Sequence, residues 1–263
     1  MKYVEGQDFF RIGRVRISVT NEDKAISSIK EVIHKKQKGY VCISTMRTVV
    51  IANEDDEYQD VMEHSILNTP DGTPLVWCGY WWGLKEVERA CGPHIFPKML
   101  NDKDSQLNHF FLGDTDETLS SLTEKARVEF GANVVGSYSP PFAPLDEYNI
   151  KGIAKIINDS GATIVWISLR APKQDYLAAM LTPFLNDGIV MVGVGAAFRS
   201  VIGLLRQPDG ILQKMGLAGL KFRRQGESRL QLVEWYFKHI IYLIKFFFLI
   251  HWKRIFGKNY WEQ

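Results

Sequence analysis

Short apolar runs alternate with longer helical stretches along this 263-residue chain, and this alternation restricts the fold more than any other feature. The apolar runs lie at 15–19, 41–44, 65–68, 110–112, 134–136, 163–169 and 189–194. Helical sequence lies at 20–36, 48–52, 116–130 and 146–158. Strands separated by helices predict a parallel sheet with helices on both faces. We therefore expect an α/β fold built on a doubly wound, Rossmann-like parallel sheet.

Polar and glycine residues fall just after these runs, at Thr45, Asp71, Gly113, Gly136, 170–174 and Gly195. Parallel strands place their carboxyl ends on one edge of the sheet, where open α/β sheets bind ligands. Glycine lets a ligand approach the backbone, and helix N-termini favour anions, so the set predicts a nucleotide-phosphate pocket. Glycine after a strand is also ordinary turn chemistry, and no single residue of the set identifies the pocket.

The segment 68–74, Asn-Thr-Pro-Asp-Gly-Thr-Pro, is the most informative of these strand ends. It predicts a helix that is capped by Thr73 and has Pro74 at its first position. The Asp71 carboxylate is then left on the strand-to-helix turn. The alternative is that Asp71 only shapes the turn, because Asp-Gly pairs are common in turns.

The net charge, the cysteine spacing and the N-terminal sequence argue against a nucleic-acid binder, a metal or redox cysteine protein and a secreted protein. A net charge of +2 does not suggest a dedicated nucleic-acid binder. Cys42, Cys78 and Cys91 form no metal or redox spacing, which predicts buried free thiols in a reducing compartment. The first eight residues lack the apolar core of a secretory signal, so we expect the protein to stay in the cytoplasm.

Two Asp-x-Asp triplets, at 102–104 and 114–116, resemble those that hold a divalent cation in many glycosyltransferases. For the second triplet we favour a helix cap, in which Asp114 or Thr115 accepts backbone N–H groups, and we expect no metal site. The six histidines show no ligand spacing and are expected to be surface or core residues. The segment 193–198, Gly-Val-Gly-Ala-Ala-Phe, lacks the third glycine of a dinucleotide loop and only weakly indicates nicotinamide binding.

The C-terminal part of the chain changes character after a basic cluster at Lys221, Arg223, Arg224 and Arg229. Residues 230–250 are rich in aromatic and aliphatic side chains, but charges interrupt them before the ~18 residues of a spanning helix are reached. Bulky apolar groups mixed with basic ones favour a helix in the lipid headgroup region. We therefore expect a domain at 1–215 and a helical membrane-association appendage at 216–263. The alternative is a helix that packs on its own domain or on a partner subunit.

In the same order along residues 15–229, the chain carries motifs that together resemble the WecG/TagA/CpsF family of glycosyltransferases. The matching pieces are Thr45, Thr69-Pro70-Asp71-Gly72, 74–77, 87–92, 111–113, 168–174, 193–198 and 213–217. Each piece is short, but the ordered set is specific.

The resemblance implies an inverting, metal-independent transfer of an N-acetylhexosamine-type sugar, N-acetylmannosamine or its uronate. The donor would be a UDP-sugar, which is a substrate and not a cofactor, and the acceptor a polyprenyl-diphosphate-linked sugar. The reaction would serve cell-surface polysaccharide or wall-polymer synthesis, by a peripheral protein on the cytoplasmic face of the cell membrane. Whether the protein forms a homo-oligomer is left open.

Under this resemblance Asp71 is the base, since inversion needs a group that takes the proton of the acceptor hydroxyl. Without a metal, the leaving UDP must be neutralised by cations and N–H groups, which Arg89 and the basic cluster are expected to supply. The full set of expected substrate-binding residues is Thr45, Gly72, Arg89, Gly113, Pro172, Lys173, Gln174, Gly195, Arg223, Arg224 and Arg229.

The chain also departs from the family pattern. Arg47 stands where the family has Asn, His94 and Arg199 where it has Asp, Asp175 where it has Glu, and Ala218-Gly219 where it has Glu-Trp. Asp71, Arg89 and Gln174 are retained, so we expect activity. The alternatives are a non-catalytic family member that binds UDP-sugar or lipid, and an NAD-dependent oxidoreductase built on 193–198.

Overall fold

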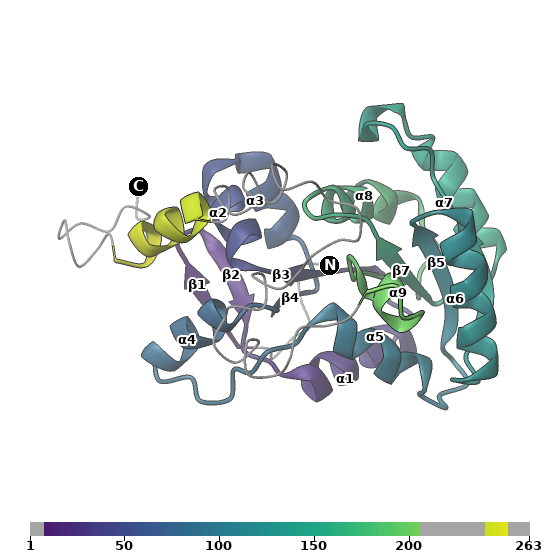
Figure 1. Ribbon diagram of the computed structural model, residues 1–263, viewed down its shortest axis with the longest axis horizontal. Helices are drawn as coiled ribbons and strands as arrows, with labels where there is room; N and C mark the ends of the chain where they lie inside the picture. Colours follow the sequence, from purple (N-terminus) through teal and green to yellow (C-terminus); the bar gives the residue numbers. More distant parts are fainter. Residues whose placement is uncertain (1–7, 206–239, 252–263) are drawn as a thin grey trace.

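The computed structural model describes residues 8–205 and 240–251 and contains a parallel sheet flanked by helices (Figure 1). The sheet has six strands in the order β4-β3-β8-β7-β5-β6, and every pair in it is parallel. Their bounds are β3 (Gly39–Ser44), β4 (Leu67–Pro70), β5 (Asn108–Gly113), β6 (Asn133–Tyr138), β7 (Ile164–Ser168) and β8 (Val190–Gly193). The predicted α/β class with a parallel sheet is confirmed.

Helices cover both faces of this sheet, and two separate cores lie beneath them. One face carries α2 (Met46–Glu54), α3 (Asp56–Glu63), α4 (Thr73–Trp81), α7 (Ile150–Asp159) and α8 (Lys173–Leu181). The other carries α1 (Glu22–His34), α5 (Gly92–Leu100), α6 (Asp116–Val128) and α9 (Ala197–Val201). Successive strand residues alternate between the cores, as in Val165 and Trp166, because side chains point to opposite faces of a strand.

The core beneath α5 and α9 is centred on the aromatic rings of Phe96, Phe111, Trp166 and Phe198. Trp166 donates its indole N–H to Nδ1 of buried His109 at 3.0 Å. Burial lowers the pKa of His109 to about 4, so its ring is neutral and can accept this bond. His109 is therefore a core residue, as the sequence predicted for the histidines that are not at the surface. The three cysteines are buried and free, as also predicted.

A short antiparallel hairpin, β1 (Phe9–Ile12) and β2 (Val15–Ser18), lies beside β4. The strand predicted at 15–19 is present as β2, but it pairs with β1 and not with the parallel sheet. The reason is a tight turn at Gly13, whose φ of +60° reverses the chain. Asn68 of β4 donates its side-chain amide to the carbonyl of Arg16 at 2.6 Å, which fixes the hairpin to the sheet.

Residues 240–251 form a helix, called here the C-terminal helical segment, that packs on the domain through one face. Phe246 is only 3% exposed and joins the core beneath α2. Lys245 forms an ion pair of 2.7 Å with Glu54, and Arg47 lies 5.7 Å from the centroid of the Tyr242 ring. One face of this segment thus packs on its own domain, and the expected membrane association of the C-terminal part stays a prediction. The expected domain boundary at 215/216 falls in 206–239, outside the described residues. No helix in the described part of the chain is both long enough and apolar enough to cross a bilayer.

Candidate active site

The ends of β3 and β4 lie side by side and carry Thr45 and Asp71. The Asp71 N–H donates to the carbonyl of Ser44 at 2.8 Å, which joins the two strand ends. The extended segment after α4 returns to this point, where the Ala90 N–H donates to the carbonyl of Pro70 at 2.9 Å. This return places Arg89 next to Asp71.

Asp71 and Arg89 form a half-buried ion pair, with side chains 23% and 29% exposed. Oδ1 of Asp71 accepts from Nη2 of Arg89 at 3.0 Å and from Nε at 3.2 Å, and Nε also donates to the Asp71 carbonyl. Burial raises the pKa of the Asp71 carboxyl above its ordinary value, and the charges of Arg89 and His94 offset part of that rise. The result is a fixed carboxylate that is more basic than one in water.

The predicted cap at Thr73 is wrong. Gly72 is the N-cap of α4, without a side-chain cap bond, and Thr73 and Pro74 are the first two helical residues. Proline fits there because the N–H that it lacks would have had no partner in the helix. Thr45 is itself a cap: its hydroxyl accepts from the Thr48 N–H at 3.3 Å at the start of α2. Its expected role toward substrate stays a prediction, as does that of Gly72.

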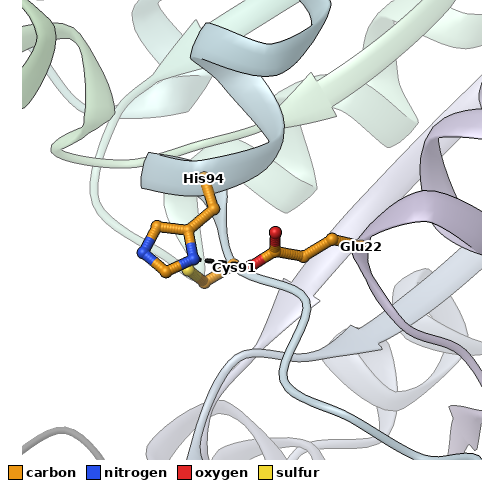
Figure 2. A group of neighbouring side chains, drawn as sticks. All are labelled: Glu22, Cys91 and His94. Atoms are coloured by element: carbon orange, nitrogen blue, oxygen red, sulfur yellow. Dashed lines mark hydrogen bonds and ion pairs between the residues drawn. The ribbon is translucent and has the colours of Figure 1, made fainter. Parts of the chain in front are cut away.

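His94 lies at the start of α5, and Figure 2 shows its ring facing Glu22 with Cys91 beside it. Nδ1 of His94 is 2.5 Å from Oε1 of Glu22, and Lys98 reaches the other carboxylate oxygen at 2.8 Å. Nitrogen and oxygen ligands of one tetrahedral Zn²⁺ would lie roughly 3.3 Å apart, so 2.5 Å indicates a hydrogen bond. Burial raises the pKa of the Cys91 thiol to about 12, which keeps it protonated. The group therefore fits a hydrogen-bonded pair better than a metal site.

A second part of the same edge lies between β5 and β7. The chain leaves β5 toward β6 and β7 toward β8, so the two connections diverge at the point where doubly wound sheets bind ligands. Gly113 has a φ of +107°, and a Cβ there would lie 2.7 Å from the carbonyl oxygen of Ser168. The Ser168 hydroxyl donates to the Gly195 carbonyl at 2.7 Å. The predicted residues Gly113 and Gly195 thus flank Ser168.

Residues at the start of α8 contact the loops of this β5–β7 part of the sheet edge. Gln174 is buried, and its Oε1 accepts from the Gly195 N–H at 3.0 Å. Lys173 donates to the carbonyl of Ala143 and lies 4.7 Å from the centroid of the Tyr148 ring, and Pro172 is the N-cap residue. In this structure these residues hold loops in place, and their contact with substrate stays a prediction.

The triplet at 114–116 serves as the start of α6, in agreement with the predicted cap. The Thr115 hydroxyl accepts from the Thr118 N–H at 3.3 Å, and Asp114 Oδ1 accepts from the Thr115 N–H at 2.9 Å. Arg199 binds both Asp114 oxygens, at 2.9 and 2.8 Å. The other triplet pairs with α1, since Asp102 and Asp104 lie 2.8 and 3.2 Å from Lys30.

Two further departures from the family pattern have local partners. Arg47 donates to the Ala171 carbonyl at 3.1 Å. Asp175 is buried away from the strand edge, where Oδ2 accepts from the Tyr58 hydroxyl at 2.6 Å. Burial raises the pKa of the Asp175 carboxyl to about 7, although the Tyr58 bond opposes the rise. Asp175 is therefore a core residue.

The expected site residues Arg223, Arg224 and Arg229, and the departure at Ala218, lie outside the described residues.

A model of the WecG/TagA/CpsF glycosyl transferase family matches residues 10–259, nearly the whole chain. The chain belongs to this family. It is therefore a glycosyltransferase of cell-surface polysaccharide synthesis, which uses a sugar donor and an acceptor. The oxidoreductase interpretation of 193–198 is wrong, because the family is one of glycosyltransferases; the segment forms the connection from β8 to α9.

Sequence reasoning missed the Glu22–His94 and Asp114–Arg199 pairs of this glycosyltransferase. Each joins residues more than 70 positions apart, and no local pattern links them. The one available signal was that His94 and Arg199 are basic residues at positions where the family has carboxylates.

Proposed function

We propose that this glycosyltransferase moves an N-acetylhexosamine, N-acetylmannosamine or its uronate, from UDP to a polyprenyl-diphosphate-linked sugar, with inversion and without a metal. The observation that carries the proposal is the Asp71–Arg89 pair at the ligand-binding edge of the sheet. A carboxylate with a raised pKa beside a guanidinium supplies both a base and a cation for a diphosphate.

In the proposed reaction Asp71 takes the proton of the acceptor hydroxyl, and the acceptor oxygen forms its bond to the anomeric carbon. The bond from that carbon to the UDP oxygen breaks on the opposite face, and its electron pair leaves with UDP. Both Arg89 side-chain bonds to the carboxylate end on Oδ1, so we assign the proton to Oδ2. Arg89 would orient the base and also screen the charge that develops on the diphosphate.

A non-catalytic binding role is the competing proposal, because several polar positions of the family are replaced. The geometry favours an active enzyme, since each replacement in the described residues has a local partner. Arg47 binds the Ala171 carbonyl, His94 binds Glu22, and Arg199 binds Asp114. Unpartnered charges at the same positions would have indicated a decayed site.

The experiment that separates these two proposals is UDP release from UDP-N-acetylmannosamine and its uronate, with and without a short-chain polyprenyl-diphosphate-linked sugar. We expect release that depends on the acceptor. Saturable UDP binding without acceptor-dependent release from either donor would favour the binding role.

Metal independence gives a separate prediction. If Asp114 only caps α6 and binds Arg199, EDTA should leave turnover unchanged. Asp114→Ala should cost about 1 kcal/mol of stability for the lost bond to the Thr115 N–H at the start of α6, measured by urea unfolding. Turnover that EDTA abolishes and Mn²⁺ restores would instead make the 114–116 triplet a metal site.

We further propose that the protein is peripheral at the cytoplasmic face of the membrane, where the lipid-linked acceptor would be presented. Basic residues from Lys238 to Lys258 should attract anionic lipid, each by roughly 1 kcal/mol. The intact chain should therefore sediment with anionic liposomes, and the sedimented fraction should fall as salt rises. Equal sedimentation at low and high salt would remove the electrostatic part of this proposal.

A further inference from the structure

Helix α4 is apolar on all sides, although one of its faces lies at the surface. Its sequence, Thr-Pro-Leu-Val-Trp-Cys-Gly-Tyr-Trp, contains no charged residue. Leu75 and Cys78 face the core, whereas Trp77, Tyr80 and Trp81 are 42%, 47% and 64% exposed. The three aromatic residues recur at i, i+3 and i+4 and so share one face. A surface helix of a soluble protein normally places polar residues there.

The exposed face of α4 lies next to the C-terminal helical segment, at the same end of the molecule (Figure 1). The Trp81 and His251 rings are 6.1 Å apart, and His251 is 4.4 Å from the Phe247 ring. The segment has its own exposed apolar residues, Ile240, Ile241, Leu243, Ile244, Phe247 and Phe248. The contact between Trp81 and His251 connects them to the exposed Trp77, Tyr80, Trp81 and Trp82, and the two sets together are called here the aromatic platform.

We propose that the aromatic platform docks on an anionic bilayer and that α4 is a membrane-contacting element in its own right. Trp and Tyr prefer the headgroup region, because each combines an apolar ring with a polar tip. The part of this inference that concerns the acceptor rests on the proposed function.

Charge favours a bilayer over a second copy of the chain. Between Glu234 and Glu262 the charged residues of the sequence are all basic, namely Lys238, Lys245, Lys253, Arg254 and Lys258, of which Lys245 pairs with Glu54. A second copy of the chain would carry the same excess of basic residues, whereas anionic headgroups would attract them.

The location of α4 connects docking to the chemistry. The helix begins two residues after Asp71, and its nine residues span about 14 Å. A bilayer that contacts Tyr80 and Trp81 would therefore lie about one short helix away from Asp71. This spacing suits an acceptor whose diphosphate lies at the headgroup level while its sugar extends into the site.

The test is cosedimentation of the full-length protein with vesicles of phosphatidylglycerol and phosphatidylcholine. Tyr80→Ala/Trp81→Ala should weaken binding about tenfold, because the removed apolar area no longer enters the interface. Trp82 is spared because its ring packs on Phe10. Matched controls are Phe142→Ala and Val128→Ala, which remove exposed apolar side chains from other elements and should bind like wild type.

Vesicle binding of the double variant equal to that of wild type would overturn the proposal. A wild-type dimer that the double substitution dissociates without lipid, in sedimentation velocity, would also overturn it and make the platform an interface between copies. If the double variant unfolds early, Trp81→Ala alone should still weaken binding severalfold. Turnover on a detergent-dispersed acceptor should be retained by the double variant. Absence of turnover in wild type would refute the proposed function but leave the vesicle result standing.

Discussion

Asp71→Asn is expected to lower the turnover number by on the order of 10²-fold or more, because the amide cannot take the proton of the acceptor hydroxyl. The isosteric side chain can still accept a hydrogen bond from Arg89, so UDP-sugar binding should change little. Single-turnover measurements at saturating donor would separate this loss from weakened binding. Near wild-type turnover in the variant would exclude Asp71 as the base.

The pH dependence of the same variant gives an independent check. In wild type, kcat/KM should fall as pH drops through the pKa of Asp71, which burial raises above its ordinary value. The variant should lack this acidic limb and keep a low residual rate. Asp102→Asn is the matched control, since it makes the same change in a carboxylate that pairs with Lys30 away from the strand edge. It should keep both the wild-type rate and the acidic limb.

The free energy of unfolding of Asp175→Asn, relative to that of wild type, is expected to change by up to about 4 kcal/mol between pH 4 and 7. The carboxyl has a pKa of about 7 in the folded protein, above the ordinary value in the unfolded chain. Its contribution to stability is therefore fully present below about pH 4 and is lost as pH rises through about 7. Relative to wild type, the variant should become progressively more stable over this range and then level off.

Urea unfolding at several pH values would measure this difference. Asp187→Asn alters an exposed carboxylate and should follow the wild-type curve. Parallel curves for wild type and Asp175→Asn would show that Asp175 does not hold a proton near neutral pH in the folded state.

The parallel sheet could be predicted because buried parallel strands are short, nearly continuous apolar runs, such as 164–168, that alternate here with helical sequence. The hairpin of β1 and β2 and the helix α5 could not be predicted from the sequence. Arg11 interrupts the apolar run of β1, and α5 contains Pro97 in its interior, which usually argues against a helix. Both elements are stabilised by tertiary contacts that outweigh local propensity.

The site was predictable only at the strand ends. Asp71 stands out because a carboxylate follows a strand directly, and strand order places it on the ligand-binding edge. The roles of Gln174 and Arg199 could not be read in the same way. Gln174 reaches Gly195 and Arg199 reaches Asp114 across the fold, so their partners become visible only when the sheet has assembled.

We propose an inverting transfer from UDP with Asp71 as the base, and the anomeric configuration of the product distinguishes inversion from retention. Proton NMR of the reaction between UDP-N-acetylmannosamine or its uronate and a short-chain polyprenyl-diphosphate-linked sugar would follow the anomeric signal of the transferred residue. From an α-linked donor, we expect a β-linked product whose appearance matches UDP release and stops with Asp71→Asn. An α-linked product, or a β-linked product formed equally fast by that variant, would contradict it.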